Sequence, residues 1–369
     1  MKNIVVLFGS PGVEHDISIL TGLHAARHVL DDTCVTLVYL TRDGRLVTSG
    51  NMGVLSKIDN HINGKVNKAP SCFFANGCLY RICGIIGAKK VCRVDAVLNC
   101  CHGGPGENGC LAGMLEMLNV PVTSCGCEAA AMLQSKTKTR EVLTREGFEQ
   151  PGVKTPSLYF APNIVSRPLY ERGNFPLIVK PDTLGSSIGI TVVHDDEQLE
   201  SALELAFSLD KKVIVEQFLD NAVEINCSAF RFGDKIWVSK CEKMSGKKEF
   251  LDFDTKYLDN TSGFSKKRGD EEEPIEREEE IQQLTRKAYE LFQCRGVVRA
   301  DFLIADNKIY LNEINTVPGF LSYHLWLKSG LPYGTLINML VDQAQVDAQN
   351  GLKTAFESEI LHKNRILVD

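Results

Sequence analysis

The sequence lacks the features of several large protein classes. No apolar run approaches the ~20 residues that a membrane-spanning helix needs, so we expect no transmembrane segment. Neither sign of charge dominates, because 41 lysines and arginines oppose 47 aspartates and glutamates and no block of the chain is strongly basic. This balance argues against binding to nucleic acids or to anionic membranes. We therefore expect the partners to be small molecules.

The sequence also lacks a disulfide framework. Its 13 cysteines are an odd number, are scattered, and include no pair with CxxC spacing. The opening MKNIVVLFGSPG has no recognisable secretion signal, so we expect a reduced, cytoplasmic protein. There is no internal repeat or low-complexity tract either. With 369 residues, 44% of them hydrophobic, the chain is that of a globular protein of two or three domains.

Short apolar runs separated by glycine turns predict an α/β fold. Residues 4–8, 35–40 and 96–101 are strand-like, and helical patterning follows the glycine turns. The turn GSPG at residues 9–12 lacks the third glycine of the dinucleotide-binding fingerprint, which leaves that function weakly supported. Residues 42–92 are interpreted as an elaboration of this first α/β layer.

The second half of the chain predicts further helices and strands around a long polar segment. One helix is expected over residues 129–143, and a strand at residues 175–181 ends at a proline. The segment 245–273 has neither helical nor strand periodicity, and a loop of this length within a domain is usually functional or disordered. It precedes a hairpin predicted for residues 297–304 and 308–314.

Four polar residues in this hairpin form the sharpest candidate site. Arg299 and Asp301 on one strand, and Glu313 and Asn315 on the other, are each spaced i, i+2, so each pair shares a face. A tight loop at residues 306–308 would set Asp301 opposite Glu313 and Arg299 opposite Asn315. Two carboxylates and an amide oxygen suit Mg²⁺ with bound phosphate. The alternative is a solvated sheet face.

Two loops at the ends of strands are further candidates. Lys180 ends an apolar strand before the loop GSSIG at residues 185–189, whose backbone N–H groups and hydroxyls can hold phosphate oxygens; a plain turn is the alternative. The loop HGGPGENG at residues 102–109 brings His102 and Glu107 to the end of a strand, where ligands often bind. A capped turn, or a zinc site shared with neighbouring cysteines, is the alternative there.

Taken in order, the motifs of this chain resemble the ATP-grasp superfamily, and specifically the D-alanine:D-alanine ligases with the related vancomycin-resistance ligases. The resemblance covers nearly the whole chain. It is carried by EHDIS at 14–18, HGGPGENG at 102–109, VKP at 179–181 with GSSIG at 185–189, KY at 256–257, RAD at 299–301 and NEINTVPG at 312–319.

The resemblance implies an α/β, three-domain ATP-grasp fold with an N-terminal Rossmann-like pre-ATP-grasp domain. By that likeness, residues 1–124 form the N-terminal substrate domain and residues 125–215 the central ATP-grasp subdomain. Residues 216–369 form the C-terminal subdomain, in which residues 245–273 are a mobile loop. The family also suggests a homodimer. ATP is expected between the central and C-terminal parts.

The resemblance assigns roles to individual residues. The catalytic set is Glu14, Ser186, Tyr257 and Arg299. The set expected to bind amino-acid substrates is His102, Glu107, Gly319, Ser322 and His324. The set expected to bind ATP is Lys136, Lys180, Ser186, Ser187, Glu216, Glu224 and Lys256. The set expected to hold Mg²⁺ or Mn²⁺ is Asp301, Glu313 and Asn315.

The activity implied is ligation of two amino acids, giving D-alanyl-D-alanine for peptidoglycan through an acyl phosphate. His324 stands where the family has a serine that binds the second amino acid, and Leu321 where a small hydroxyl residue is usual. A different amine acceptor such as D-serine is therefore an alternative, although Tyr257 favours an amine over a hydroxy acid. A nucleotide-binding regulator that has lost catalysis is another. Cys100, Cys101 and Cys110 are interpreted as packing thiols beneath the acceptor loop.

Overall fold

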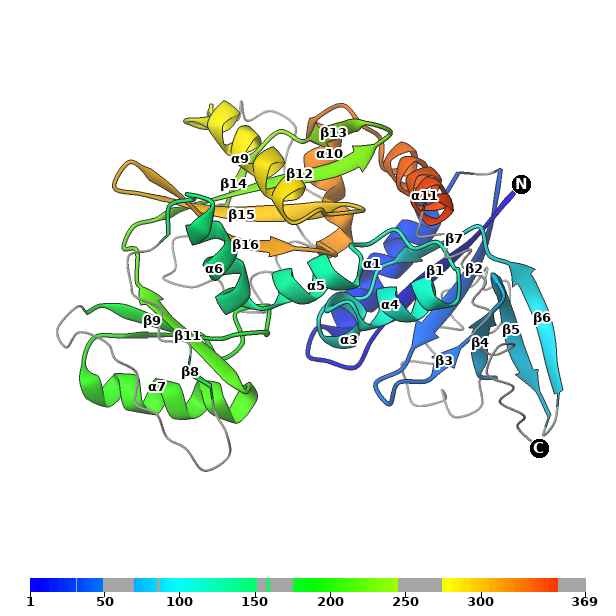
Figure 1. Cartoon of the computed structure of the whole chain (residues 1–369), viewed down its shortest axis with the longest axis horizontal. Helices are drawn as coiled ribbons and strands as arrows, with labels where there is room; N and C mark the ends of the chain where they lie inside the picture. The colour runs from blue at the N-terminus through cyan, green and yellow to red at the C-terminus, as the bar shows by residue number, and fades with distance from the viewer. Residues whose placement is uncertain are drawn as a thin grey trace, which may run out of the picture.

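The structure is a computed structural model whose described residues form helices and four β-sheets (Figure 1). Within the described residues, no helix combines the length and apolar character needed to cross a membrane. The residues that the structure describes are 1–30, 32–48, 70–84, 87–150, 158–159, 175–244 and 274–350.

The N-terminal sheet, at the right of Figure 1, has the strand order β3-β2-β1-β7. Strand β1 runs parallel to both β2 and β7, so each crossover must return to the same end of the sheet. The elements of this sheet and its first helix are β1 (Lys2–Gly9), α1 (His15–His28), β2 (Thr33–Leu40), β3 (Leu46–Val47) and β7 (Ala96–Asn99).

Strand β1 is buried on both faces. Ile4, Val6 and Phe8 pack into one core, and Val5 and Leu7 pack into another on the opposite side of the sheet. An all-apolar strand of this kind is typical of a parallel sheet covered by helices on both faces. The expected parallel α/β layer is therefore confirmed.

A small antiparallel sheet accounts for the described part of the expected elaboration at residues 42–92. Its order is β4-β5-β6, with β4 (Cys72–Ala75), β5 (Cys78–Cys83) and β6 (Gly87–Arg93). Phe74 and Leu79 of this sheet join the core that contains Val5 and Leu7. The small sheet therefore extends one face of the N-terminal layer.

Helices connect the N-terminal sheet to the rest of the chain. They are α3 (Gly104–Glu107), α4 (Cys110–Met117), α5 (Cys127–Gln134) and α6 (Lys136–Arg145). The single helix expected over residues 129–143 is wrong, because the backbone is extended at Ser135, with a ψ of 111°. The Ser135 hydroxyl accepts the Lys138 N–H and so begins a new helix.

The central sheet, at the lower left of Figure 1, has the order β10-β9-β11-β8 and is antiparallel. Helix α7 packs on β9 and β11 through Leu199, Ala202 and Ala206, in a core of their own. The elements are β8 (Leu158–Tyr159), β9 (Leu177–Pro181), β10 (Thr191–Val193), α7 (Asp196–Leu209) and β11 (Lys212–Gln217).

The C-terminal sheet, at the top of Figure 1, has the order β13-β12-β15-β16, and β14 also pairs with β12. Its apolar face, with Ile225, Phe302 and Ile314, packs against α9, α5 and α6 in one core. The elements are β12 (Val223–Phe232), β13 (Lys235–Val238), β14 (Glu242–Lys243), α9 (Glu278–Leu291), β15 (Val298–Ala305) and β16 (Lys308–Asn315).

The last described segment returns to the N-terminal sheet. It contains the 3-10 turn η3 (Gly319–Ser322), α10 (Tyr323–Lys328) and α11 (Tyr333–Gln349). Leu321, Trp326 and Leu340 share the core of Ile4 and Phe8. One hydrophobic core therefore joins β1 to the last described helix, α11, and fixes the segment after β16 against α1. The domain limits at residues 124 and 215 stay a prediction.

Two of the three cysteines assigned to packing are buried. Cys100 and Cys101 have no exposed surface and belong to cores on opposite sides of the sheet, as expected for adjacent strand residues. Burial raises the pKa of both thiols. The interpretation of Cys110 is wrong, because this residue is exposed at the start of α4.

Candidate active site

The acidic hairpin has the register that the sequence predicts. Asp301 pairs with Glu313, and Arg299 pairs with Asn315, so the four side chains share one face of the C-terminal sheet. The intervening residue, Ala300, belongs to the apolar core on the other face. Alternation of side chains along the two strands thus separates a polar face from a packed one.

A β-bulge adds a fifth polar residue that sequence reasoning missed. Asp301 pairs with Glu313 but Phe302 pairs with Leu311, so Asn312 is an extra residue on β16. A bulge redirects the side chain of the extra residue. The Asn312 Oδ1 atom accepts hydrogen bonds from Lys180 Nζ at 3.2 Å and Arg140 Nη2 at 3.3 Å.

The carboxylate of Asp301 is the centre of the polar face. Arg299 donates two hydrogen bonds to it, from Nε at 2.6 Å and from Nη2 at 2.7 Å, and Asn315 Nδ2 donates a third at 2.9 Å. Only 4% of the Asp301 side chain is exposed. A two-pronged arginine contact of this kind fixes the orientation of both side chains.

The oxygen groups on this face fit a hard divalent cation. Asp301, Glu313 and Asn315 offer two carboxylates and an amide, which is the ligand chemistry that Mg²⁺ or Mn²⁺ prefers. Asn226 lies in the same row opposite Asp301, and its buried Oδ1 atom has no hydrogen-bond partner among the described residues. Over the same residues, no group of three or more His, Cys, Asp or Glu side chains is arranged to hold a metal.

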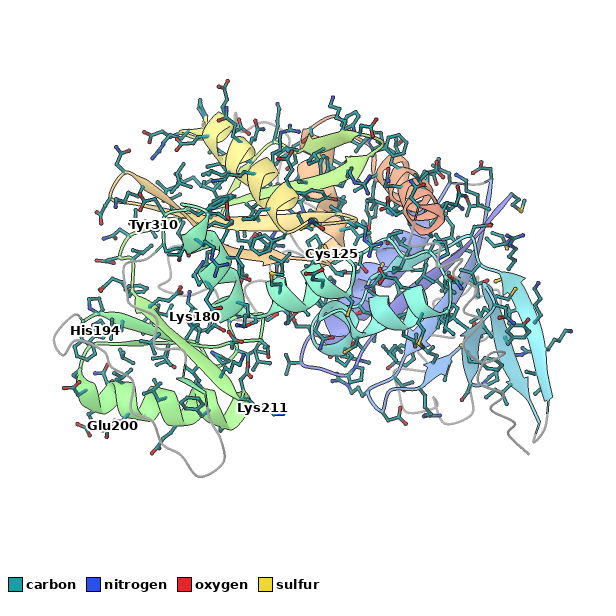
Figure 2. The ribbon with its side chains drawn as sticks, viewed as in Figure 1. Cys125, Lys180, His194, Glu200, Lys211 and Tyr310 are labelled. Carbon is teal, nitrogen blue, oxygen red and sulfur yellow. The ribbon has the colours of Figure 1, made fainter. Side chains whose placement is uncertain are left out.

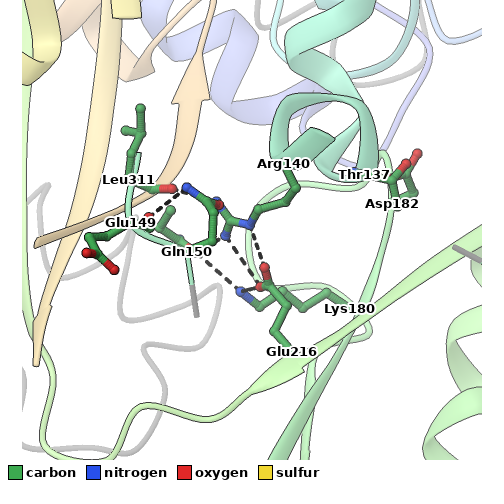
Figure 3. Close-up of polar contacts among 9 residues, drawn as sticks. Thr137, Arg140, Glu149, Gln150, Lys180, Asp182, Glu216 and Leu311 are labelled. Atoms are coloured by element: carbon green, nitrogen blue, oxygen red, sulfur yellow. Dashed lines mark hydrogen bonds and ion pairs between the residues drawn. The ribbon is translucent and has the colours of Figure 1, made fainter. Parts of the chain in front are cut away.

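A buried triad of charged side chains joins helix α6 to the central sheet (Figure 3). Glu216 on β11 accepts from Arg140 Nε at 2.5 Å and from Lys180 Nζ at 2.7 Å. Its side chain is only 3% exposed. Burial alone would raise its pKa, but Arg140 and then Lys180 outweigh burial and hold the pKa well below its usual range.

Arg140 was not predicted as a site residue. It reaches across from α6 and also donates from Nη1 to the backbone oxygen of Leu311 at 2.5 Å. One signal was available, because Lys136 and Arg140 are spaced i, i+4 in KTKTR and therefore share a helix face. Lys180 lies beside α6 on the central sheet, where Figure 2 labels it.

Lys136 lies at the start of α6 and faces the same region. Its Nζ atom donates to the backbone oxygen of Leu184 at 2.6 Å. Burial lowers its pKa, an effect that Glu313 opposes and Lys180 reinforces. The electrostatic coupling shows that three elements, α6, β9 and β16, bring their charges to one place.

Asp182 fixes the glycine-serine loop to the start of α6. Its carboxylate accepts the Thr137 N–H and the Ser135 hydroxyl, each at 2.7 Å. After it, Ser186 and Ser187 have left-handed backbones, with φ of 54° and 58°. Successive N–H groups in a turn can form an anion-binding concavity, so the loop retains the chemistry expected from its sequence.

The loop meets Glu14 from the N-terminal domain. The Ser186 hydroxyl donates to Glu14 Oε1 at 2.5 Å, although 172 positions separate the two residues. Two glycines permit this approach, since a Cβ atom at Gly185 would lie 2.9 Å from both Glu14 carboxylate oxygens and one at Gly103 would lie 2.6 Å from Oε2. Glu14 is 9% exposed. The structure thus brings together two residues of the expected catalytic set.

Glu107 ties the loop after β7 to the segment after β16. It accepts the N–H of Gly103 at 2.9 Å and that of Val317 at 3.0 Å. Burial, with the nearby Glu14 carboxylate, raises the pKa of Glu107 to about 7. Glu14 and Glu107 therefore face a common region, in which the Glu107 carboxyl keeps its proton to a higher pH than an ordinary glutamate does.

His102 is fully enclosed by protein groups. Its Nδ1 atom contacts the backbone oxygen of Val317 at 2.6 Å, and its Nε2 atom contacts Thr21 Oγ1 at 2.7 Å. Burial lowers its pKa to about 4, against the opposing effect of the hydrogen bond that it donates to the Val317 carbonyl. The imidazole is therefore neutral at pH 7, with its proton on Nδ1, because a carbonyl can only accept. Its expected contact with substrate stays a prediction.

The neutral state of His102 makes stability depend on pH. Its folded pKa of about 4 lies below the usual histidine pKa of 6.5, so the unfolded chain binds a proton between these values and the folded one does not. Unfolding free energy should fall by about 3 kcal/mol from this residue as pH drops from 6.5 towards 4. Urea unfolding of the wild type and His102→Gln across this range checks it. The difference in unfolding free energy between the two proteins should change with pH. A constant difference would contradict the lowered pKa of His102.

The segment after β16 has a strained backbone. Phe320, Leu321 and Ser322 are consecutive left-handed residues, with φ of 50°, 53° and 54°, and none is glycine. Left-handed conformation costs roughly 1–2 kcal/mol for each such residue, so tertiary contacts must hold this turn. Gly319 directly precedes them, and Ser322 has no exposed surface.

His324 lies outside this turn and is paired. Its Nε2 atom is 3.0 Å from Glu242 Oε2, and Lys328 Nζ is 2.9 Å from Glu242 Oε1. Burial opposes ionisation of Glu242, but the hydrogen bond from His324 and the charge of Lys328 lower its pKa. His324 thus contacts β14, whereas Leu321, the neighbour of Ser322, packs in the core that contains Ile4 and Phe8.

The remaining predicted residues are placed as follows. Glu224 is half-buried on β12, on the same face as Asn226. Lys256 and Tyr257, with the whole segment 245–273, lie outside the described residues. The structure therefore brings Glu14, Ser186, Lys136, Lys180 and the acidic hairpin around one region, between the three sheets.

The overall architecture matches solved structures of one class. The structure has a TM-score of 0.74 against the D-alanine–D-alanine ligase from Helicobacter pylori, at 26% identity, covering 93% of this chain and 98% of the other. For the ligase from Coxiella burnetii the TM-score is 0.77 at 25% identity, covering 95% and 97%. This fold, with lysines beside the central sheet and carboxylates on the C-terminal sheet, defines an ATP-grasp ligase.

Sequence comparison narrows the class to a family. A family model for the D-ala D-ala ligase N-terminus matches residues 3–125, and one for the C-terminus matches residues 159–342. A D-alanine–D-alanine ligase of Thermosipho africanus is 34% identical over 349 residues, which is 93% of each chain. The chain belongs to the D-Ala–D-Ala ligase family.

Proposed function

We propose that this chain joins two molecules of D-alanine at the expense of ATP, giving D-alanyl-D-alanine, ADP and phosphate. The observation that carries the proposal is the convergence of three groups in one region: the Glu14–Ser186 pair, the lysines at 136 and 180, and the polar face of Arg299, Asp301, Glu313 and Asn315. The product is a peptidoglycan precursor, and the reaction is assigned to the cytoplasm, where ATP is made.

The first step forms an acyl phosphate. A carboxylate oxygen of the first D-alanine attacks the γ-phosphorus of ATP, and the bond to ADP breaks. Lys136 and Lys180 neutralise charge on the phosphate oxygens, and the loop of Ser186 and Ser187 offers N–H and O–H donors. Glu14 receives the ammonium group of this D-alanine. Glu216 acts here by holding Lys180 in place, and Glu224 lies on the side assigned to the ribose.

A divalent cation fits the acidic hairpin, where Asp301, Glu313 and Asn315 would hold it. When bound, Mg²⁺ or Mn²⁺ supplies positive charge beside the phosphate oxygens. The residues of the chain perform the rest of the chemistry, with Arg299 on the same face as the three ligands.

The second step forms the peptide bond. The deprotonated amine of the second D-alanine attacks the carbonyl carbon of the acyl phosphate, and phosphate leaves from the tetrahedral intermediate. The guanidinium of Arg299 stabilises the oxyanion, a role in which one donor often contributes ~3–4 kcal/mol. Gly319, Ser322 and His324, with His102 and Glu107 behind them, form the side that receives the acceptor. Lys256 and Tyr257 are assigned to the same site by sequence.

The proposal is tested by supplying the purified chain with D-alanine, ATP and MgCl₂. Phosphate and D-alanyl-D-alanine should appear in equal amounts. Glu313→Gln, which removes one cation ligand while keeping its size, should lower turnover about 100-fold or more, because the charge of the moving phosphoryl group is then poorly neutralised. Folded wild-type protein that binds ATP but makes neither product would contradict the proposal.

The identity of the acceptor is tested in the same assay. The pairing of His324 with Glu242 differs from a simple serine hydroxyl, so D-serine is the competing acceptor. With D-alanine as the donor, D-alanine should also be the faster acceptor when both are offered at equal concentration. Equal or faster formation of D-alanyl-D-serine would assign the alternative function.

A further inference from the structure

A chain of hydrogen bonds closes the turn between Val317 and Phe320. The Phe320 N–H donates to Thr21 Oγ1 at 3.1 Å, Thr21 Oγ1 contacts His102 Nε2 at 2.7 Å, and His102 Nδ1 contacts the Val317 oxygen at 2.6 Å. The chain begins and ends on the same turn, three residues apart. It runs through α1 and the loop after β7, two elements of the N-terminal domain.

The direction of every hydrogen bond in this chain is fixed. A backbone N–H can only donate, so Thr21 Oγ1 accepts from Phe320, and a carbonyl can only accept, so His102 Nδ1 carries a proton. The neutral imidazole then has only an acceptor at Nε2, to which the Thr21 hydroxyl must donate. Each group donates or accepts in the only way open to it. Loss of the Thr21 hydroxyl therefore leaves the Phe320 N–H and His102 Nε2 without their partner.

The turn held in this way leads into the left-handed residues Phe320, Leu321 and Ser322. Besides Thr21, the first of these contacts His24 on α1, with ring centroids 5.3 Å apart. The Ser322 hydroxyl is fully buried and has no hydrogen-bond partner among the described residues. A strained turn that ends in an unsatisfied buried hydroxyl is costly, which is typical of backbone held for function.

We propose that Thr21 is a positioning residue for the second amino acid, holding the turn from Val317 to Ser322 in its left-handed conformation through His102. The inference rests on the proposed function, in which this turn forms the acceptor side. The hydrogen bonds of the Thr21 hydroxyl go to Phe320 and His102, and neither residue belongs to the acidic hairpin or to the set assigned to ATP. Its effect should therefore be confined to the affinity for the acceptor.

The test compares two substitutions at one position. Thr21→Val keeps the shape of the side chain but removes the hydroxyl, and Thr21→Ser keeps the hydroxyl. We expect the valine variant to raise KM for the acceptor D-alanine about tenfold, with KM for ATP and for the donor D-alanine within about twofold of wild type. The serine variant should restore the acceptor KM to within about threefold. Thr285→Val, at a buried threonine of α9, is the matched control and should leave all three values unchanged.

Hydrogen exchange gives a readout that does not need activity. The Phe320 amide should exchange at least tenfold faster in Thr21→Val than in wild type or Thr21→Ser, because its acceptor is lost. Equal kinetics and equal exchange in active wild type and Thr21→Val would overturn the inference. So would a valine variant that raises all three KM values together, or that serine does not rescue. Wild type that makes no dipeptide while Phe320 exchange still responds would instead refute the proposed function.

Discussion

Arg299→Ala should lower the rate of ligation by about 100- to 1,000-fold while ATP still binds within a few fold of wild type. The reason is that Arg299 shares a sheet face with Asp301, Glu313 and Asn315, and we propose that charge develops at this face as phosphate leaves. Its guanidinium is held by two hydrogen bonds to Asp301, so the oxyanion meets a donor that needs no reorganisation. Lys180, on another strand, keeps its contacts in this variant.

Two measurements separate the catalytic effect from a loss of structure. Arg299→Lys keeps the positive charge but replaces a planar fork by a point charge, so it should remain about tenfold or more below wild type. Single-turnover dipeptide formation and ATP titration are measured on both variants, with unfolding curves to show that each is folded. An alanine variant within about fivefold of wild type would mean that Arg299 serves only to hold Asp301.

The hairpin shows what a local pattern can predict. Strand periodicity and a tight loop are enough to set Asp301 opposite Glu313, and the structure has that register. The bulge at Asn312 was not predictable, because inserting one residue costs little locally and depends on what Lys180 and Arg140 offer across the gap. Local sequence thus defines the face but not every side chain that reaches it.

The other features that the sequence did not predict depend on contacts between segments that are distant in the sequence. Arg140 looks like an ordinary residue of a basic helix until Glu216, 76 positions away, is brought beside it. The left-handed run from Phe320 to Ser322 contains no glycine, so local preference argues against it and only packing on α1 can impose it. Ser186 and Glu14 were assigned to one catalytic set only because the motifs resemble a known family, and no spacing rule predicts their contact.

Glu216→Gln should lower the free energy of unfolding by about 3–5 kcal/mol. The substitution keeps the shape of the side chain but leaves Arg140 and Lys180, whose side chains are 6% and 9% exposed, as adjacent buried cations with no anion between them. Removing one partner of a buried ion pair is costly because the remaining charge stays desolvated. Urea unfolding at pH 7 measures the loss. The matched control is Glu141→Gln, whose partner Lys138 is exposed, and it should cost less than about 1 kcal/mol.

The pH dependence and a second substitution show whether charge is the cause. Because the pKa of Glu216 is lowered in the folded state, its contribution to stability is present above the usual glutamate pKa of 4.5 and is lost as pH falls towards the lowered pKa. The difference in unfolding free energy between wild type and Glu216→Gln should therefore become smaller in acid. Adding Arg140→Met to Glu216→Gln removes one of the two uncompensated cations, so the double variant should be more stable than the sum of the two single losses predicts. Strictly additive losses, or a stability difference that does not change with pH, would mean that packing of the Glu216 side chain, rather than its charge, joins α6 to the central sheet.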